Sequence, residues 1–253
     1  MPFSDYRTAL VTGASAGMGL AIAERLQREG LEVHAIGRNR AGLDALSESA
    51  GCTTHVVDVT DTAALERLLG GLEIDVLVNN AGVSRSGNIL SSGRFDVDEQ
   101  VDVNLRAALH LARLTLPGMI RRNRGHVFNI TSIAGHYEFS GHTVYHATKA
   151  AMHTVSRQLR VDAFGSDVRV TEICPGRVET DIFARVQNIP PDEARRLYFD
   201  DYDCPKPGDI ADAVAYAIGV PRHVNVGLIE IVPTRQVPGG LRTGKKGEPA
   251  EMG

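Results

Sequence analysis

Tryptophan is absent from this sequence of 253 residues, and cysteine is scarce, with three residues in all. Cys52, Cys174 and Cys204 lack the spacing of a metal knuckle or of a redox Cys-x-x-Cys pair, which favours a reducing compartment. No apolar run approaches the roughly 18 residues of a membrane span, and no secretory signal precedes the first apolar run. We therefore expect a cytoplasmic protein with no membrane segment.

An excess of positive charge is missing as well. The 27 Lys and Arg residues are outnumbered by 31 Asp and Glu residues, and the formal net charge is −4. Nucleic acids and anionic membranes attract cationic surfaces, so neither is expected as a partner, and any anion site must be local. With 43% hydrophobic and 23% charged residues, the composition is that of an ordinary globular domain.

Short apolar runs alternate with longer amphipathic segments along the chain. The runs that predict buried strands are 9–11, 33–36, 55–57, 76–78, 126–130, 168–173 and 228–232. Helical periodicity occurs over residues 20–28, 41–49, 63–69, 101–120, 144–164 and 210–218. This alternation predicts an α/β fold with a parallel sheet and right-handed crossovers.

Nothing resembling a linker or a repeat divides the chain. We predict one domain over residues 1–238, followed by a polar tail over 239–253 that is rich in Gly, Lys and Glu. Residues 175–207 interrupt the strand and helix rhythm. Because structureless insertions of such length in a compact domain are usually functional, we expect a substrate lid over about 177–207.

A glycine-rich turn, TGASAGMG at residues 12–19, joins the first predicted strand to the first predicted helix. Gly13 permits a sharp turn, Gly17 lets the backbone approach a pyrophosphate, and Gly19 lets the helix pack closely on the sheet. The helix N-terminus then offers free N–H groups to phosphates. The strand, turn and helix context predicts a nucleotide site, with an ordinary glycine turn as the alternative.

The residues after the second predicted strand, AIGRNR at 35–40, contain no carboxylate for a ribose hydroxyl. Arg38 could instead bind a 2′-phosphate, assisted by Ser15 and Arg40. The alternative is that Arg38 is a solvated loop cation. We predict NADP(H) as the cofactor.

A candidate catalytic pair, Tyr145 and Lys149, is spaced so that both side chains share one face of a predicted helix. A phenol titrates near pH 10, and a neighbouring cation lowers that pKa. Such a pair often arises by chance, so its significance depends on its surroundings. Ser132, at the end of the fifth predicted strand, precedes Tyr145 by thirteen residues.

The TGxxxGxG turn, the tetrapeptide Asn-Asn-Ala-Gly at 79–82 and the Ser132, Tyr145 and Lys149 set resemble the short-chain dehydrogenase/reductase family over residues 8–233. The resemblance implies a single-domain, Rossmann-like, doubly wound sheet of about seven strands and a nicotinamide cofactor. It implies that Ser132 binds the substrate oxygen, that Tyr145 exchanges the proton, and that Lys149 binds the ribose and lowers the tyrosine pKa. Asn104 would hold a relay water.

The same resemblance assigns cofactor contacts along the chain. Asp58 and Val59 would face the adenine, although capping is an equally good role for Asp58. The turn PGRVET at 175–180 would hold the carboxamide. The predicted cofactor residues are Gly13, Ser15, Ala16, Gly17, Met18, Gly19, Arg38, Asp58, Val59, Asn80, Ala81, Gly82, Tyr145, Lys149, Pro175, Gly176, Val178 and Thr180.

Segments at 116–119, 169–171, 221–226 and 230–233 resemble the NADP-dependent 3-hydroxy acid/serine dehydrogenase branch, in which related reductases act on sulfoacetaldehyde and malonic semialdehyde. Such small anions require a cationic partner. The candidates are Arg177, Arg185, Arg195 and Arg85, with His136 and His142 at the substrate mouth. A reductase of neutral ketones or aldehydes and a catalytically silent NADP-binding regulator are the alternatives.

Four histidines, at 136, 142, 146 and 153, gather near the catalytic segment. We predict no metal site, because no carboxylate or cysteine completes a tetrahedral set and the tyrosine chemistry needs no metal. Family members commonly pair through the helices that carry Asn104 and Tyr145. A homodimer or homotetramer is therefore expected.

Overall fold

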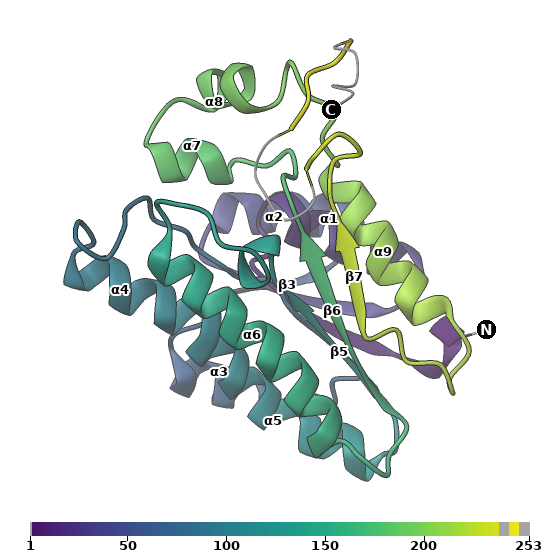
Figure 1. Ribbon diagram of the computed structural model, residues 1–253. Coiled ribbons are helices and arrows are strands. Elements are labelled where there is room, and N and C mark those ends of the chain that lie inside the picture. The colour runs from purple at the N-terminus through teal and green to yellow at the C-terminus, as the bar shows by residue number, and fades with distance from the viewer. Residues whose placement is uncertain (1, 238–242, 248–253) are drawn as a thin grey trace.

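A computed structural model describes residues 2–237 and 243–247 of the chain (Figure 1). Seven parallel strands form one sheet in this part, in the order β3-β2-β1-β4-β5-β6-β7. The strands are β1 (Thr8–Thr12), β2 (Glu32–Gly37), β3 (Thr53–Val56), β4 (Val76–Asn79), β5 (Gly125–Ile130), β6 (Val168–Pro175) and β7 (Leu228–Ile231). The predicted α/β class and the seven-stranded parallel sheet are confirmed. Within the described ranges, no helix combines the length and the apolar character needed to cross a membrane.

Helices cover both faces of the sheet and create two apolar cores (Figure 1). Helices α1 (Gly17–Arg28), α2 (Arg40–Ala50) and α9 (Pro207–Gly219) contribute Ile22, Leu43 and Val214 to one core. Helices α3 (Thr62–Leu69), α5 (Ala107–Arg121) and α6 (Thr143–Asp162) contribute Leu65, Leu111 and Leu159 to the other.

The strand order reverses between β1 and β4, since the chain first proceeds outward through β2 and β3 and then returns. In open parallel sheets, ligands bind in the crevice beyond the carboxyl ends of the strands at such a switch point. The chain also forms two short 3-10 helices, η1 (Pro2–Asp5) and η3 (Ile133–Gly135). The topology therefore places the candidate site above β1, β2 and β4.

Two helices fill the region that the sequence predicted as structureless. They are α7 (Ile182–Gln187) and α8 (Pro191–Tyr198), and they lie beyond the carboxyl ends of the strands (Figure 1). Pro191 starts α8, where its missing N–H costs nothing. The expectation of a structureless insertion is wrong, while its role as a lid stays a prediction. Of the predicted tail, residues 239–242 and 248–253 lie outside the described residues.

The predicted helix at 101–120 is interrupted in the structure. It consists of α4 (Arg94–Val101), a π-helical turn η2 (Asp102–Arg106) and α5. The N–H of Ala107 donates to the carbonyl of Asp102, five residues back, as a π-turn requires. Such turns are frequent at functional sites, and this one carries Asn104.

Candidate functional site

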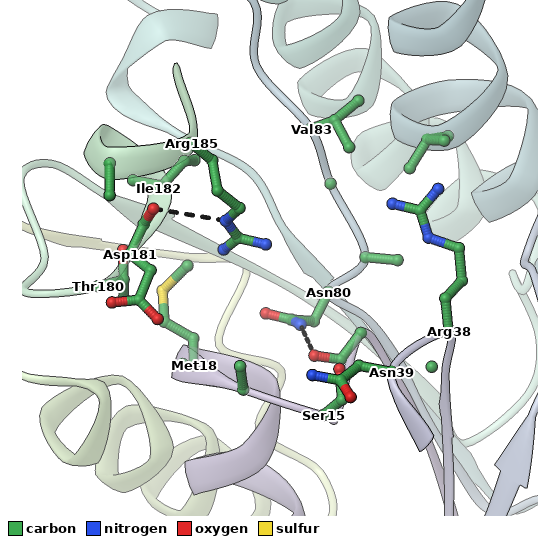
Figure 2. Close-up of a pocket in the computed structure, with 18 of the residues that line it drawn as sticks. Ser15, Met18, Arg38, Asn39, Asn80, Val83, Thr180, Asp181, Ile182 and Arg185 are labelled. Atoms are coloured by element: carbon green, nitrogen blue, oxygen red, sulfur yellow. Dashed lines mark hydrogen bonds between the residues drawn. The ribbon is translucent and has the colours of Figure 1, made fainter. Parts of the chain in front are cut away.

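A cleft of about 780 Å³ opens above the switch point (Figure 2). The glycine-rich turn forms its floor, the ends of β2 and β3 form one wall, and α7 forms the facing wall. The predicted cofactor residues that line it are Gly13, Ser15, Ala16, Gly17, Met18, Arg38, Asp58, Val59, Asn80, Ala81, Gly82 and Thr180. Lining residues absent from the prediction include Val83, Val103, Ile182, Asn188, Ile189 and Pro191.

The glycine turn needs its glycines for different reasons. Gly13 and Gly17 have φ angles of +65° and +58°, a backbone region that favours glycine. A Cβ on Gly19 would lie 2.4 Å from the carbonyl oxygen of Gly13 and from Nδ2 of Asn80. Gly19 therefore serves close packing beneath the turn, and it does not line the cleft.

Thr12 joins this turn to the loop after β4. Its Oγ1 donates to the carbonyl of Val78 at 3.2 Å and accepts from the N–H groups of Asn80 and Ala81 at 3.0 Å each. In return, Nδ2 of Asn80 donates to the carbonyl of Thr12 at 2.8 Å. This threonine, for which no role was predicted from the sequence, orients both loops of the cleft floor.

Arg38 extends into the cleft from the end of β2 (Figure 2). Its side chain is 62% exposed, and its Nη1 lies 3.7 Å from Oδ2 of Asp58. Oδ1 of Asp58 accepts from both the N–H and the hydroxyl of Thr60, at 2.9 and 2.8 Å. Asp58 thus performs the local turn role that the sequence left open and also lines the cleft. The exposed guanidinium is available to an anion.

The structure brings Ser132, Tyr145 and Lys149 together. Ser132 follows β5 and caps η3, with its Oγ accepting from the N–H of Ala134 at 3.2 Å. Tyr145 hydrogen-bonds Ser132. Nζ of Lys149 donates to the carbonyl of Ile130 at 3.0 Å and lies 5.7 Å from the centre of the Tyr145 ring.

Burial shifts the pKa values of both titratable members of this set. It lowers the pKa of Lys149 to about 8, against the opposing effects of Cys174 and Glu172, which favour the charged amine. It also raises the pKa of Tyr145, and the hydrogen bond from Ser132 offsets part of that rise. Burial outweighs the effect of Ser132, and the lowering of the tyrosine pKa by Lys149 stays a prediction.

Asn104 is buried in the π-turn and holds the loop after β4. Its Oδ1 accepts from the N–H of Val83 and its Nδ2 donates to the carbonyl of Val83, both at 2.8 Å. Nδ2 also lies 3.1 Å from Oγ1 of Thr148. Both amide hydrogens are therefore engaged. A water relay, the role that the resemblance implied, stays a prediction and would need another group of this residue.

Gly82 joins the cleft to the catalytic set. A Cβ at this position would lie 3.5 Å from Oδ1 of Asn104 and 3.6 Å from Nζ of Lys149. Thr180 faces the glycine turn, since a Cβ on Gly17 would lie 3.5 Å from its Cγ2. Tyr145, Lys149, Pro175, Gly176 and Val178 do not line the cleft itself. Their predicted contacts with the cofactor stay predictions.

The predicted anion-binding residues have different surroundings. Arg85 pairs with Glu99 at 2.6 Å, and Arg195 pairs with Glu179 at 2.5 Å and Asp200 at 3.2 Å. Arg177 donates to the carbonyl of Tyr198 at 3.4 Å and stacks over the Tyr202 ring at 4.8 Å.

Arg185 lines the cleft, and Figure 2 shows its side chain opposite Arg38. Its Nε donates to the backbone carbonyl of Asp181 at 3.4 Å. Nδ1 of His142 is buried with no hydrogen-bond partner in the described part of the chain. The substrate role of His142 is untested, while Arg185 is the arginine of the four that the cleft exposes to a ligand.

A carboxylate and a cysteine do lie near one of the four histidines, because one ligand atom each of His136, Glu172 and Cys174 lie within 4.8 Å of one another. Three ligands do not complete a tetrahedral set, and the predicted absence of a metal site stays a prediction. Alternate positions 172 and 174 on β6 place both side chains on one face of the sheet, and these residues are distant in sequence from His136. Nε2 of His136 lies 3.2 Å from Oε1 of Glu172, and its predicted place at the substrate mouth stays a prediction.

Comparison with known proteins gives a consistent picture. Residues 7–189 match the family model described as short chain dehydrogenase. The chain is 40% identical to an uncharacterised short-chain type dehydrogenase/reductase, y4eK, of Sinorhizobium fredii, over 96% of this chain and 98% of that protein. It is 38% identical to the NADP-dependent 3-hydroxy acid dehydrogenase YdfG of Salmonella typhi, over 92% and 97%. The closed form of serine dehydrogenase complexed with NADP+ superposes with a TM-score of 0.86 and 35% identity, over 94% and 99%.

Proposed function

The chain belongs to the short-chain dehydrogenase family, and from this premise we propose that it transfers hydride between NADP(H) and a small anionic alcohol or carbonyl compound. The observation that carries the proposal is the contact of Tyr145 with Ser132, with Lys149 beside them, next to a nucleotide-sized cleft. A protein that only bound nucleotide would have no chemical use for that set.

The residues of the cleft fit a nicotinamide dinucleotide. The Gly17 to Gly19 turn at the start of α1 offers backbone N–H groups to a pyrophosphate. Arg38 offers an exposed guanidinium to a 2′-phosphate, and no carboxylate stands at the end of β2 to repel it. The NADP-dependent relative and the NADP+ complex of serine dehydrogenase support the same choice.

The chemistry assigned to this chain is a proton transfer coupled to the hydride transfer that the cofactor supplies. Ser132 would hold the substrate oxygen, and Tyr145 would exchange a proton with it through its hydroxyl. Lys149, charged below a pKa of about 8, would stabilise the phenolate during that exchange.

Within the family, the substrate is proposed to be a 3-hydroxy acid or a sulfoacetaldehyde-like anion, held by Arg185 in the wall of the cleft. A set of hydroxy acids, hydroxysulfonates and neutral alcohols, each assayed with NADP+ and with NAD+, tests cofactor and substrate together. The proposal expects a preference of at least about tenfold for NADP+ and for the anions. Equal kcat/KM values for neutral alcohols and acids would favour the neutral carbonyl alternative.

A further inference from the structure

A buried carboxylate, Glu172 in β6, lies beside the catalytic set, with its side chain 2% exposed. The hydroxyl of Thr131 donates to its Oε1 at 2.6 Å. Nε2 of His136 lies 3.2 Å from Oε1, and Nδ1 of His153 lies 2.7 Å from Oε2. Three side chains from two segments of the chain, residues 131–136 and α6, thus engage both oxygens of one carboxylate.

Both of these segments carry catalytic residues. Thr131 stands between Ile130, which accepts from Lys149, and Ser132. His136 ends the short turn that Ser132 caps. His153 lies one helical turn beyond Lys149 and two turns beyond Tyr145 on α6. A single side chain therefore connects the strand end that holds the substrate oxygen to the helix that supplies the proton.

We propose that Glu172 is a positioning residue for the reaction, which fixes Ser132 through Thr131 and His136, and fixes Tyr145 and Lys149 through His153. This inference rests on the proposed function of the site. Catalytic groups must be held within a fraction of an ångström of their working geometry, and misplacement by about 1 Å costs on the order of a hundredfold in rate.

The charge of Glu172 has a second effect on the same set. Burial lowers the pKa of Lys149, whereas Glu172 and Cys174 on β6 both act to raise it. Among the described residues, Tyr145 is a further titratable neighbour of Lys149, and it lies on the same helix, α6. Loss of the Glu172 charge should therefore lower the pKa of Lys149 further below about 8.

A metal ion is the competing occupant of this cluster, because His136, Glu172 and Cys174 offer nitrogen, oxygen and sulfur ligands. The hydrogen bonds favour the positioning role. Both carboxylate oxygens already accept from protein donors. The buried ammonium of Lys149 would also repel a second cation nearby.

The test is the Glu172→Gln variant, which keeps the size of the side chain and removes its charge. Its matched control is Asp75→Asn, another carboxylate that is 1% exposed and multiply bonded, to Arg122, Arg124 and the N–H of Arg7, at the opposite end of the sheet. We expect kcat to fall at least tenfold in Glu172→Gln and less than twofold in Asp75→Asn, with the NADPH KM of both within twofold of the parent.

A second readout needs no turnover. Urea unfolding from pH 6 to 10 should show stability that increases above the pKa of Lys149, and the increase should be absent in Lys149→Met. In Glu172→Gln the increase should begin at lower pH. An unchanged onset, together with a kcat equal to that of the control, would overturn the proposal.

The remaining outcomes are also decisive. If Glu172→Gln does not fold, Thr131→Val and His153→Asn test the same role, because each removes one donor to Glu172 and should lower kcat. Thr131→Ser keeps the hydroxyl and should therefore restore the kcat that Thr131→Val loses. Loss of parent activity with a chelator and its return with Zn2+ would replace the positioning role by a metal site. If the parent turns over none of the substrates, the proposed function fails, and the unfolding series still decides the role of Glu172.

Discussion

The side-chain amide of Asn104 accepts a hydrogen bond from the N–H of Val83 and donates one to its carbonyl, and each bond is 2.8 Å long. Asn225 holds Val170 in the same way, at 2.9 and 3.0 Å, near the start of β6 and thus at the opposite end of the sheet from the cleft. The two asparagines make equivalent contacts with their valines. They differ in that Asn104 also donates to Oγ1 of Thr148 at 3.1 Å, and in that Val83 lines the cleft beside Gly82.

Alanine variants of Asn104 and Asn225 distinguish an effect on stability from an effect on activity. Asn104→Ala and Asn225→Ala should each lower the free energy of unfolding by about 1–3 kcal/mol, because both leave backbone groups unpaired. Only Asn104→Ala should also lower kcat, by tenfold or more, since it releases the loop beside Lys149. Urea unfolding and steady-state kinetics measure the two effects. Equal kcat values in the two variants would show that the Val83 contact is purely structural.

Arg38 is predicted to distinguish the two nicotinamide cofactors. Arg38→Gln should raise the KM for NADPH about 10- to 100-fold, the value of a charge-assisted contact of about 1.5–3 kcal/mol. The KM for NADH should change less than twofold. Arg28→Gln, at an exposed cation in the last turn of α1, is the control and should affect neither. A similar rise for both cofactors would mean that Arg38 does not recognise a 2′-phosphate.

Arg185 is predicted to hold the anionic group of the substrate. Arg185→Gln should lower kcat/KM for acids about 10- to 100-fold and leave neutral alcohols within twofold. Arg195→Gln, in which the arginine is already paired with Glu179 and Asp200, is the matched control in the same segment. If Arg185→Gln lowers kcat/KM equally for acids and neutral alcohols, the guanidinium contacts the cofactor and not the substrate.

Lys149 is predicted to reduce stability while it serves catalysis. Its folded pKa of about 8 lies below the ordinary lysine pKa of 10.5, so the unfolded chain binds more protons between these values. Stability should therefore rise as pH increases from about 8 to 10.5, and the cost of burying the charge is greatest below pH 8. Lys149→Met should raise the melting temperature at pH 7 and abolish turnover. A lower melting temperature at pH 7 would show that the bond to Ile130 outweighs that cost.

The sheet and the catalytic segment were predictable because their signals are local. Seven apolar runs correspond to seven strands, and Tyr145 and Lys149 share a helix face through their spacing alone. The cluster around Glu172 was not predictable in this way. Glu172 lies within a buried strand, and it meets Thr131 and His153 only through the pairing of β5 with β6 and the packing of α6 on that sheet. The wall formed by α7 likewise depends on tertiary packing.

The Tyr145→Phe variant tests whether Tyr145 transfers the proton. The measurement is NADPH oxidation with the best carbonyl substrate, beside NADPH affinity from fluorescence titration of the same preparation. We predict a fall in kcat of about 10²- to 10⁴-fold, the contribution of a general acid, with NADPH affinity within twofold of the parent. A variant that keeps its kcat within a factor of two would contradict the account.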